Sequence, residues 1–221
     1  MNYLLIDTSN QPLSVAVMQD DQVLSELNSN EKKNHSVQLM PAIIKVLQSA
    51  HVDKKDLDAI VVAEGPGSYT GLRIGVTVAK TLAYALNIKL YGVSSLKALA
   101  ATVSKTNQLI VPIFDARREA VYAGVYYYDD NQLHCAMNDQ YITIEALLNH
   151  LHDLQQSYIF VGEDSEKLQD LLDAEFIANL PQAKTMYSLI DTVPNDVYTF
   201  KPNYLKISEA ERNWLNQQNK N

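Results

Sequence analysis

Cysteine is almost absent from this sequence, and histidine is scarce. Cys135 is the only cysteine, so no disulfide bond can form within the chain. Because no reactive motif surrounds Cys135, we expect a buried structural thiol and not a nucleophile. The five histidines include no pair at a spacing that binds metal, since His150 and His152 are two residues apart and fall on different faces of a helix. These absences argue against disulfide-stabilised and metal-dependent proteins.

Long apolar runs are also missing. No stretch reaches the length of a transmembrane helix, and Asp7 interrupts the apolar N-terminus, which lacks the basic region of a signal peptide. We therefore expect a cytoplasmic protein. Acidic residues outnumber basic ones by 26 to 18, for a formal net charge of −8. This charge argues against independent, non-specific binding to a phosphate backbone.

The common catalytic motifs are absent as well. The glycine-rich stretch 64–71 lacks the ending of a Walker A loop, because Leu72 and Arg73 follow Gly71. Thr70 stands where a Rossmann fingerprint needs its third glycine, and neither Gly-x-Ser-x-Gly nor His-Glu-x-x-His occurs. By its residues alone, the stretch can hold an anion on backbone N–H groups or can simply connect a strand to a helix. The second interpretation is the simpler one.

What the sequence does contain is one order of strands and helices, found twice. The first half predicts strands at 3–7, 13–19 and 22–27, a helix at 36–50, a strand at 59–63, a helix at 70–86, a strand at 89–93 and a helix ending near 104. The second half predicts strands at 109–114, 120–128 and 132–137, a helix at 144–152, a strand at 158–161 and a helix at 165–172. Helices connect the later strands of each half, which should therefore pair in parallel.

These elements predict an α/β protein of two duplicated βββαβα lobes, residues 1–105 and 106–221. Residues 176–203 show little periodicity and are expected to form an irregular wrap in the second lobe.

Two helices of the first half have unusual features. Ser36 is expected to cap the helix at 36–50, and Pro41 to kink it or delay its start. In the helix at 70–86, apolar residues cover an arc of about 200°, twice what packing on one sheet requires. Small residues four positions apart form a low ridge on this arc: Gly71, Gly75, Ala79 and Ala83. The ridge faces either a partner or another surface of the same chain, and the residues do not decide between the two.

The run GPGSYTGLRIG at 65–75, with the strand at 89–93 and DARRE at 115–119, resembles the TsaB family, also called YeaZ. The start LLIDTS at 4–9 and the end PNYLKISEAERNWL at 202–215 are similar too, so the resemblance spans nearly the whole chain. It implies a two-lobed actin-like fold, shared with Hsp70 and sugar kinases. It also implies a role in forming threonylcarbamoyladenosine beside the anticodon of certain tRNAs, where a TsaD-type paralogue carries the chemistry.

The resemblance further implies a subunit without catalytic activity. TsaD proteins hold their metal with a His-x-x-x-His pair on the helix after the strand at 89–93, where this chain has Ser95 and Leu99, so we expect no metal. An actin-like fold makes the turn residues Asp7, Thr8, Ser9 and Asp115 the candidates for contacting a nucleotide, although such residues are also ordinary in turns. The adenosine loop lacks glycines, since VGED at 161–164 has one glycine and two carboxylates. We expect no tightly bound cofactor, with ATP or ADP at most at the interface of the complex.

The helices at 36–50 and 70–86 are expected to bind the partner. The candidate interface residues are Val37, Met40, Ile44, Gly71, Leu72, Gly75, Val76, Ala79 and Ala83. The implied partners are a TsaD-like paralogue and a TsaE-like ATPase, with tRNA reached only through the complex, and a second copy of the chain when it is alone. The alternative is a stand-alone enzyme of the same fold, either a relative of ATP-dependent kinases or a glycoprotease-like metallopeptidase.

Overall fold

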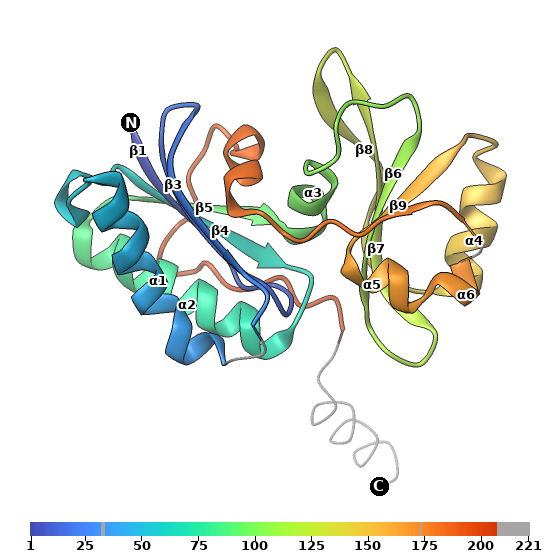
Figure 1. Cartoon of the computed structure of the whole chain (residues 1–221), viewed down its shortest axis with the longest axis horizontal. Helices are drawn as coiled ribbons and strands as arrows, with labels where there is room; N and C mark the ends of the chain where they lie inside the picture. The colour runs from blue at the N-terminus through green and yellow to red at the C-terminus, as the bar shows by residue number, and fades with distance from the viewer. Residues whose placement is uncertain (32–33, 173, 207–221) are drawn as a thin grey trace, which may run out of the picture.

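Two five-stranded sheets build two lobes (Figure 1). The computed structural model describes residues 1–31, 34–172 and 174–206. The first sheet contains β1 (Asn2–Asp7), β2 (Leu13–Gln19), β3 (Gln22–Ser29), β4 (Ala59–Gly65) and β5 (Lys89–Ser94). The second contains β6 (Leu109–Asp115), β7 (Ala120–Asp129), β8 (Gln132–Thr143), β9 (Tyr158–Val161) and β10 (Phe176–Ile177).

The two sheets share one topology. Their orders are β3-β2-β1-β4-β5 and, read from the corresponding edge, β8-β7-β6-β9-β10. In each, the first three strands form an antiparallel meander, and the later strands pair in parallel. The duplicated arrangement predicted from the alternation of elements is confirmed.

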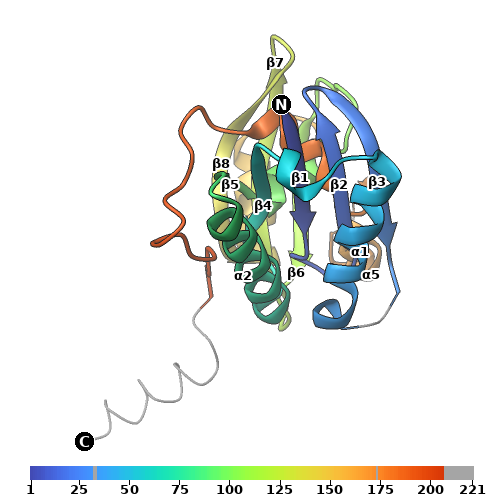
Figure 2. The same ribbon diagram turned by 90° about the vertical axis from the view of Figure 1, so that its left-hand side faces the viewer.

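Helices α1 (His35–Ala50) and α2 (Tyr69–Leu86) lie side by side on one face of the first sheet (Figure 2). In the part of the chain that the structure describes, the second lobe carries α4 (Ile144–Asp153) and the short α5 (Glu163–Lys167) and α6 (Gln169–Leu172). These last two replace the single helix predicted at 165–172. No helix in the described part of the chain has both the length and the apolar character needed to cross a bilayer.

The start of α1 differs from its prediction. Asn34 caps the helix by accepting a hydrogen bond from the Ser36 backbone N at 3.0 Å, so Ser36 is not the cap. Pro41 lies inside the helix and does not delay its start. An Asn cap satisfies an N–H group that has no partner within the helix, as a serine would.

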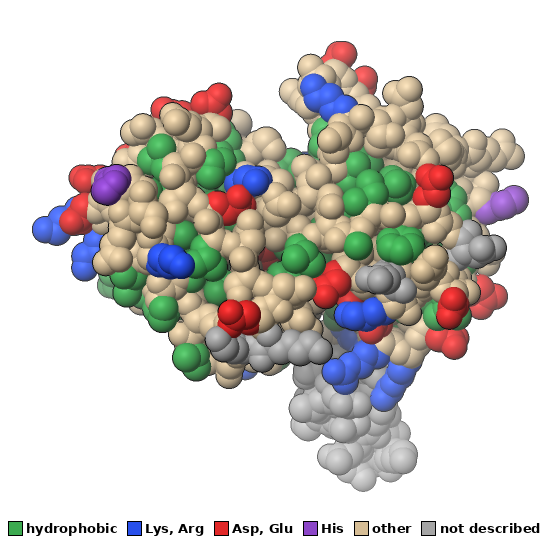
Figure 3. Space-filling view, in the orientation of Figure 1, with side chains coloured by type: hydrophobic (Ala, Val, Ile, Leu, Met, Phe, Trp, Pro, Cys, Tyr) green, Lys and Arg blue, Asp and Glu red, His purple; other side chains and the backbone are tan. Residues whose placement is uncertain are grey.

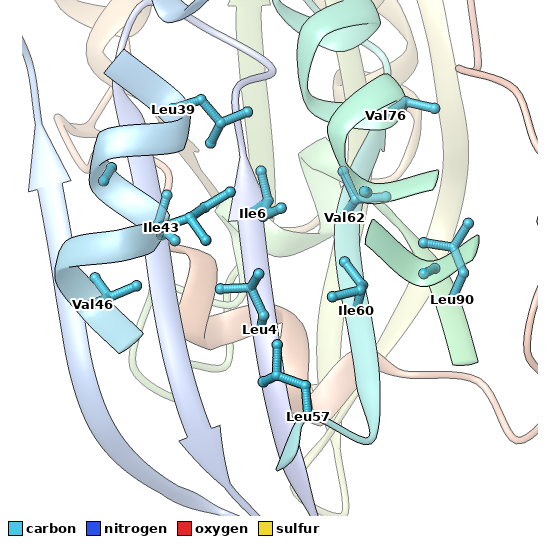
Figure 4. Packing of buried hydrophobic residues seen from close by; sticks show 14 of the residues in the cluster. Leu4, Ile6, Leu39, Ile43, Val46, Leu57, Ile60, Val62, Val76 and Leu90 are labelled. Atoms are coloured by element: carbon cyan, nitrogen blue, oxygen red, sulfur yellow. The ribbon is translucent and has the colours of Figure 1, made fainter. Parts of the chain in front are cut away.

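The larger core of the first lobe lies between its sheet and the two long helices (Figure 4). Leu4 and Ile6 of β1 are fully buried there against Ile43 of α1. Val62 of β4 and Val76 of α2 complete the same cluster. This packing sets which side of each helix is left for solvent.

The opposite face of the first sheet is covered by the irregular C-terminal segment. The 3₁₀ helix η2 (Ala183–Leu189) buries Ala183 and Met186 against Leu5 and Val61. Asn195 then covers the edge of β5, where it pairs with Leu90 and Gly92. The expectation that this wrap belongs to the second lobe is therefore wrong, because most of it returns to the first.

Helix α3 (Ser95–Ala100) joins the lobes and ends earlier than predicted. Leu96 and Leu99 of this helix share a buried cluster with Phe114, Tyr126 and other residues of the second lobe. Both residues are 0% exposed. The lobes are therefore packed on each other through α3, in addition to being connected by the polypeptide chain.

Candidate functional site

The turn after β1 holds three polar residues that are almost completely buried. Asp7, Thr8 and Ser9 are 1%, 1% and 0% exposed. Asp7 Oδ1 accepts hydrogen bonds from Ser9 N at 2.8 Å and Ser9 Oγ at 2.7 Å, whereas Asp7 Oδ2 has no hydrogen-bond partner among the described residues. Burial raises the pKa of Asp7, and the bonds from Ser9 and the nearby His35 partly oppose this.

The glycine-rich turn before α2 packs directly onto this β1–β2 turn. Ser68 N donates to Ser9 O at 2.7 Å, and Thr8 Oγ1 donates to Gly71 O at 2.8 Å. A Cβ atom on Gly71 would lie 2.1 Å from Thr8 O, and one on Gly75 would lie 2.3 Å from Thr8 Oγ1. Glycine is required because the backbone of α2 approaches the turn too closely for a side chain. These contacts favour a tight strand-to-helix connection over an anion-binding loop.

The small-residue ridge of α2 therefore faces the inside of its own lobe. Ala79 and Ala83 are 0% and 1% exposed, and they belong to the core between the sheet and the helices. The prediction that α2 presents its small residues to a partner is wrong, because the same lobe already covers them. All six candidate interface residues on α2 are buried within the lobe: Gly71, Leu72, Gly75, Val76, Ala79 and Ala83.

Three other candidate interface residues do lie at the surface, on α1. Val37, Met40 and Ile44 are 71%, 42% and 51% exposed. Their spacing places them on one face of α1, turned away from the buried Leu39 and Val46. We call these three residues the α1 stripe. Hydrophobic side chains are visible on the surface of this lobe in Figure 3, in the region where Figure 1 places α1 and α2.

The first residues of α5, directly after β9, reach across to the first lobe. Asp164 is 5% exposed. Its Oδ2 accepts hydrogen bonds from the backbone N of Asp115 at 3.0 Å and from Nδ2 of Asn10 at 3.3 Å. Its Oδ1 pairs with Lys167 Nζ at 2.5 Å, a hydrogen bond that raises the pKa of Lys167. Because Asn10 belongs to the β1–β2 turn, Asp164 connects the two lobes.

Asp115, the second candidate carboxylate for nucleotide contact, is exposed at the end of β6. Its Oδ1 accepts from Arg117 N at 2.7 Å. The structure thus brings Asp115 and the turn that contains Asp7 close to each other, on either side of Asp164. We call the place where Asn10, Asp115 and Asp164 meet the junction. Figure 3 shows acidic side chains at this boundary between the lobes.

The junction does not suit the phosphates of a nucleotide. The donors that converge on it already bind Asp164, and Glu163 adds a second carboxylate there, which accepts from Asn30 Nδ2 at 3.3 Å. Gly162, between β9 and α5, has φ +130° and would bring a Cβ atom within 2.8 Å of Ile113 O. It therefore allows close packing against β6.

Sequence reasoning missed a half-buried carboxylate on β8, beside the start of α3. Asp139 of β8 accepts hydrogen bonds from Ser94 Oγ and Tyr126 OH. Burial raises the pKa of Asp139, and these two hydrogen bonds and the nearby Lys97 partly oppose this. The sequence pattern ends the strand at residue 137, so it gave no reason to place Asp139 in a sheet that faces α3.

The two positions expected to lack metal ligands have structural roles. Ser95 Oγ accepts a hydrogen bond from Gly65 N at 3.0 Å, and Leu99 lies in the core between the lobes. Within residues 1–31, 34–172 and 174–206, no three His, Cys, Asp or Glu side chains are grouped so that they could hold a metal ion. Cys135 corrects another prediction, because it is exposed on the edge strand β8 and not buried.

Comparison with known proteins places the chain in a family. The family model described as "TsaD: tRNA N6-adenosine threonylcarbamoyltransferase" matches residues 22–219. The chain is 40% identical to the tRNA threonylcarbamoyladenosine biosynthesis protein TsaB of Bacillus subtilis (strain 168), over 99% of this chain and 100% of that protein. It is 28% identical to the TsaB of Escherichia coli (strain K12), over 77% of this chain and 75% of that protein.

A solved structure agrees. YeaZ from Pseudomonas aeruginosa matches with a TM-score of 0.78 and 23% identity, covering 92% of this chain and 99% of that chain. The predicted fold class, a two-lobed actin-like α/β fold with duplicated lobes, is confirmed. With a family model over most of its length and a relative 40% identical across 99% of it, the chain belongs to the TsaB family.

Proposed function

We propose that this chain is a non-catalytic subunit that binds and activates a TsaD-type paralogue in the formation of threonylcarbamoyladenosine beside the anticodon of tRNA. Membership of the TsaB family supports the role in this biosynthesis, and the matching TsaD family model supports a partner of related fold. The observation that carries the proposal is the exposed apolar α1 stripe. In this proposal the two paralogues join a TsaE-like ATPase in a cytoplasmic complex. This acidic chain reaches tRNA only through its partners.

The lack of catalysis is inferred from how the junction is used. Its hydrogen-bond donors serve Asp164, and Ser95 and Leu99 are buried for structural reasons. A nucleotide-dependent enzyme needs donors left available for phosphate oxygens. Any ATP or ADP in the complex is therefore bound at the shared interface and not at the junction of this chain.

The α1 stripe has the geometry of a helix-packing surface. Ile44 lies seven positions after Val37, which is about 10 Å along a helix. Pro41 is also exposed between Met40 and Ile44 and adds apolar surface. Covering an exposed apolar side chain contributes about 1.5 to 3 kcal/mol when the side chain becomes fully buried. A helix of the partner is the occupant that matches a straight apolar line of this length, and a second copy of α1 takes its place when no partner is present.

Substitution of Val37 by Asp tests the proposal. A carboxylate placed in an apolar contact loses its water without gaining a partner, so Val37→Asp should weaken binding to the TsaD-type paralogue about 10- to 100-fold. The affinity is measured with purified proteins, and threonylcarbamoyladenosine formation with the TsaE-like ATPase added. Val193→Asp is the matched control, because Val193 is 73% exposed and Val37 is 71% exposed.

Equal affinities for the two variants and the wild type would remove the α1 stripe from the interface. Modification of tRNA, or sustained ATP turnover, by the isolated chain would instead support the stand-alone enzyme. Thermal melts of both variants show whether each is folded before its affinity is compared.

A further inference from the structure

We propose that the junction between the lobes contains an oxyanion-binding site that the chain fills with its own Asp164 carboxylate. The native protein would then hold an internal anion where donors from both lobes converge, and a free anion could bind only if that carboxylate were removed. This inference does not depend on the proposed function, since it concerns the junction and not the α1 stripe.

Three donors from three parts of the fold converge on Asp164. They are the backbone N of Asp115 at the end of β6 (3.0 Å), the side-chain amide of Asn10 in the β1–β2 turn (3.3 Å) and the ammonium of Lys167 on α5 (2.5 Å). A backbone N–H, an amide N–H and an ammonium are a donor set that suits the oxygens of a carboxylate or a phosphate. The carboxylate that they hold is 5% exposed.

Two further polar atoms at the junction have capacity that the described residues do not use. Ser165 Oγ, adjacent to Asp164 in the chain, and Asp7 Oδ2, in the same turn as Asn10, are both buried without a hydrogen-bond partner there. A buried hydroxyl can donate to an anion. Ser165 therefore offers one unused hydroxyl beside Asp164 in the chain.

The charge balance explains why the site is filled from within. The carboxylates of Asp115, Glu163 and Asp164 lie around the junction, and Lys167 is already paired with Asp164. A second anion would meet net negative charge. The carboxylate of Asp164 therefore closes the junction to anionic ligands and links the lobes through Asn10.

Replacement of Asp164 by Ala provides a test, because it removes a carboxylate of the size of formate and leaves the three donors in place. Thermal melts of the full chain are recorded in sodium formate and in sodium chloride of equal ionic strength. Asp170→Ala is the matched control: Asp170 is an exposed carboxylate on α6 of the same lobe. Each melt is compared with that of the wild type.

We expect Asp164→Ala to melt below the wild type in chloride and to recover by about 2 to 4 °C in saturating formate. The wild type and Asp170→Ala should melt at the same temperature in both salts. Equal formate effects in all three proteins, or an Asp164→Ala variant as stable as the wild type in chloride, would overturn the proposal.

A second variant separates a specific site from a simple cavity. Asn10→Ala, introduced into Asp164→Ala, removes the donor from the first lobe and should raise the formate concentration needed for half of the recovery several-fold. An unchanged formate dependence would mean that formate does not occupy the position of the Asp164 carboxylate, and would also overturn the proposal. If Asp164→Ala is unfolded in chloride, folding that then depends on formate supports the site. If Asp164→Ala fails to fold in both salts while Asp164→Asn folds, the proposal is contradicted.

Discussion

The two lobes have the same strand order and even the same first turn, but different helices. Asp7 ends β1 and accepts a hydrogen bond from the backbone N two residues later, and Asp115 does the same at the end of β6. The first turn is buried under α2, whereas Asp115 is exposed. One local hydrogen-bond pattern is therefore kept in both halves, while its surroundings determine what each carboxylate can do.

The helices that follow show where the lobes differ most. The connection after β4 leads into the 18 residues of α2, and the equivalent connection after β9 leads into α5 and α6, with 5 and 4 residues. Long helices give the first lobe a broad surface, including the α1 stripe. The short helix α5 after β9 instead places Asp164 against the first lobe. Thus one half of the duplication supplies the exposed apolar surface and the other supplies the contacts that close the junction.

Because the two lobes share a core, we expect them to unfold together. Leu99→Ala tests this expectation with the largest effect. Leu99 is fully buried in the core that both lobes share. Truncating such a leucine costs about 2 to 5 kcal/mol of unfolding free energy. Hydrogen exchange should speed up in both β1 and β6. Leu171→Ala, at a side chain 45% exposed on α6, should change stability by about 0.5 kcal/mol or less. Faster exchange in β6 alone would show that the lobes unfold independently.

The burial of α2 can be tested with a smaller expected effect. Ala79→Leu adds volume to a fully buried site, and overpacking costs about 1 to 3 kcal/mol, or about 2 to 4 °C in melting temperature for each kcal/mol in a protein of this size. Binding of the folded variant to a partner should be unchanged. Ala85→Leu, at an exposed position of the same helix, should melt like the wild type. A normal melt with weakened binding by Ala79→Leu would return the small-residue ridge to the interface.

The burial of Asp7 should make stability depend on pH, and this is the smallest of the three expected effects. Burial raises the pKa of Asp7 above its usual 3.8, so protonated Asp7 stabilises the fold fully below that pH, and this stabilisation is lost as the pH rises through the folded-state pKa. Asn cannot ionise, so the melting temperature of Asp7→Asn relative to wild type should increase as the pH rises from about 3. Asp115→Asn is the control at the exposed turn. A relative melting temperature that stays constant with pH for Asp7→Asn would contradict the burial argument.

The elements were predictable where local patterns decide them. The strands at 13–19 and 158–161 have the predicted bounds, because alternation and apolar runs depend only on neighbouring residues. The helix at 165–172 was predicted as one, although it is two. The bounds of these two helices depend on the contacts that the residues after β9 make with the first lobe, and no local sequence pattern predicts those contacts.

The candidate site was predictable only in part. The α1 stripe follows from helical spacing, and the turn residues Asp7 and Asp115 follow from their position after strands. Asp164 and Asn10 are 154 positions apart, so their contact could not be read from spacing. The orientation of α2 was mispredicted because an apolar arc shows how much surface is buried but not what covers it.

The sequence by itself determined the order of the elements, their duplication and the family, because these depend on local propensity and on motifs that stay together along the chain. Only the tertiary structure decided that the small residues of α2 pack against the β1–β2 turn, that the C-terminal wrap returns to the first lobe and that Asp164 reaches Asn10. The physical reason is that side chains distant in sequence compete for the same buried surface and hydrogen-bond donors. The outcome of that competition depends on the packing of the whole chain.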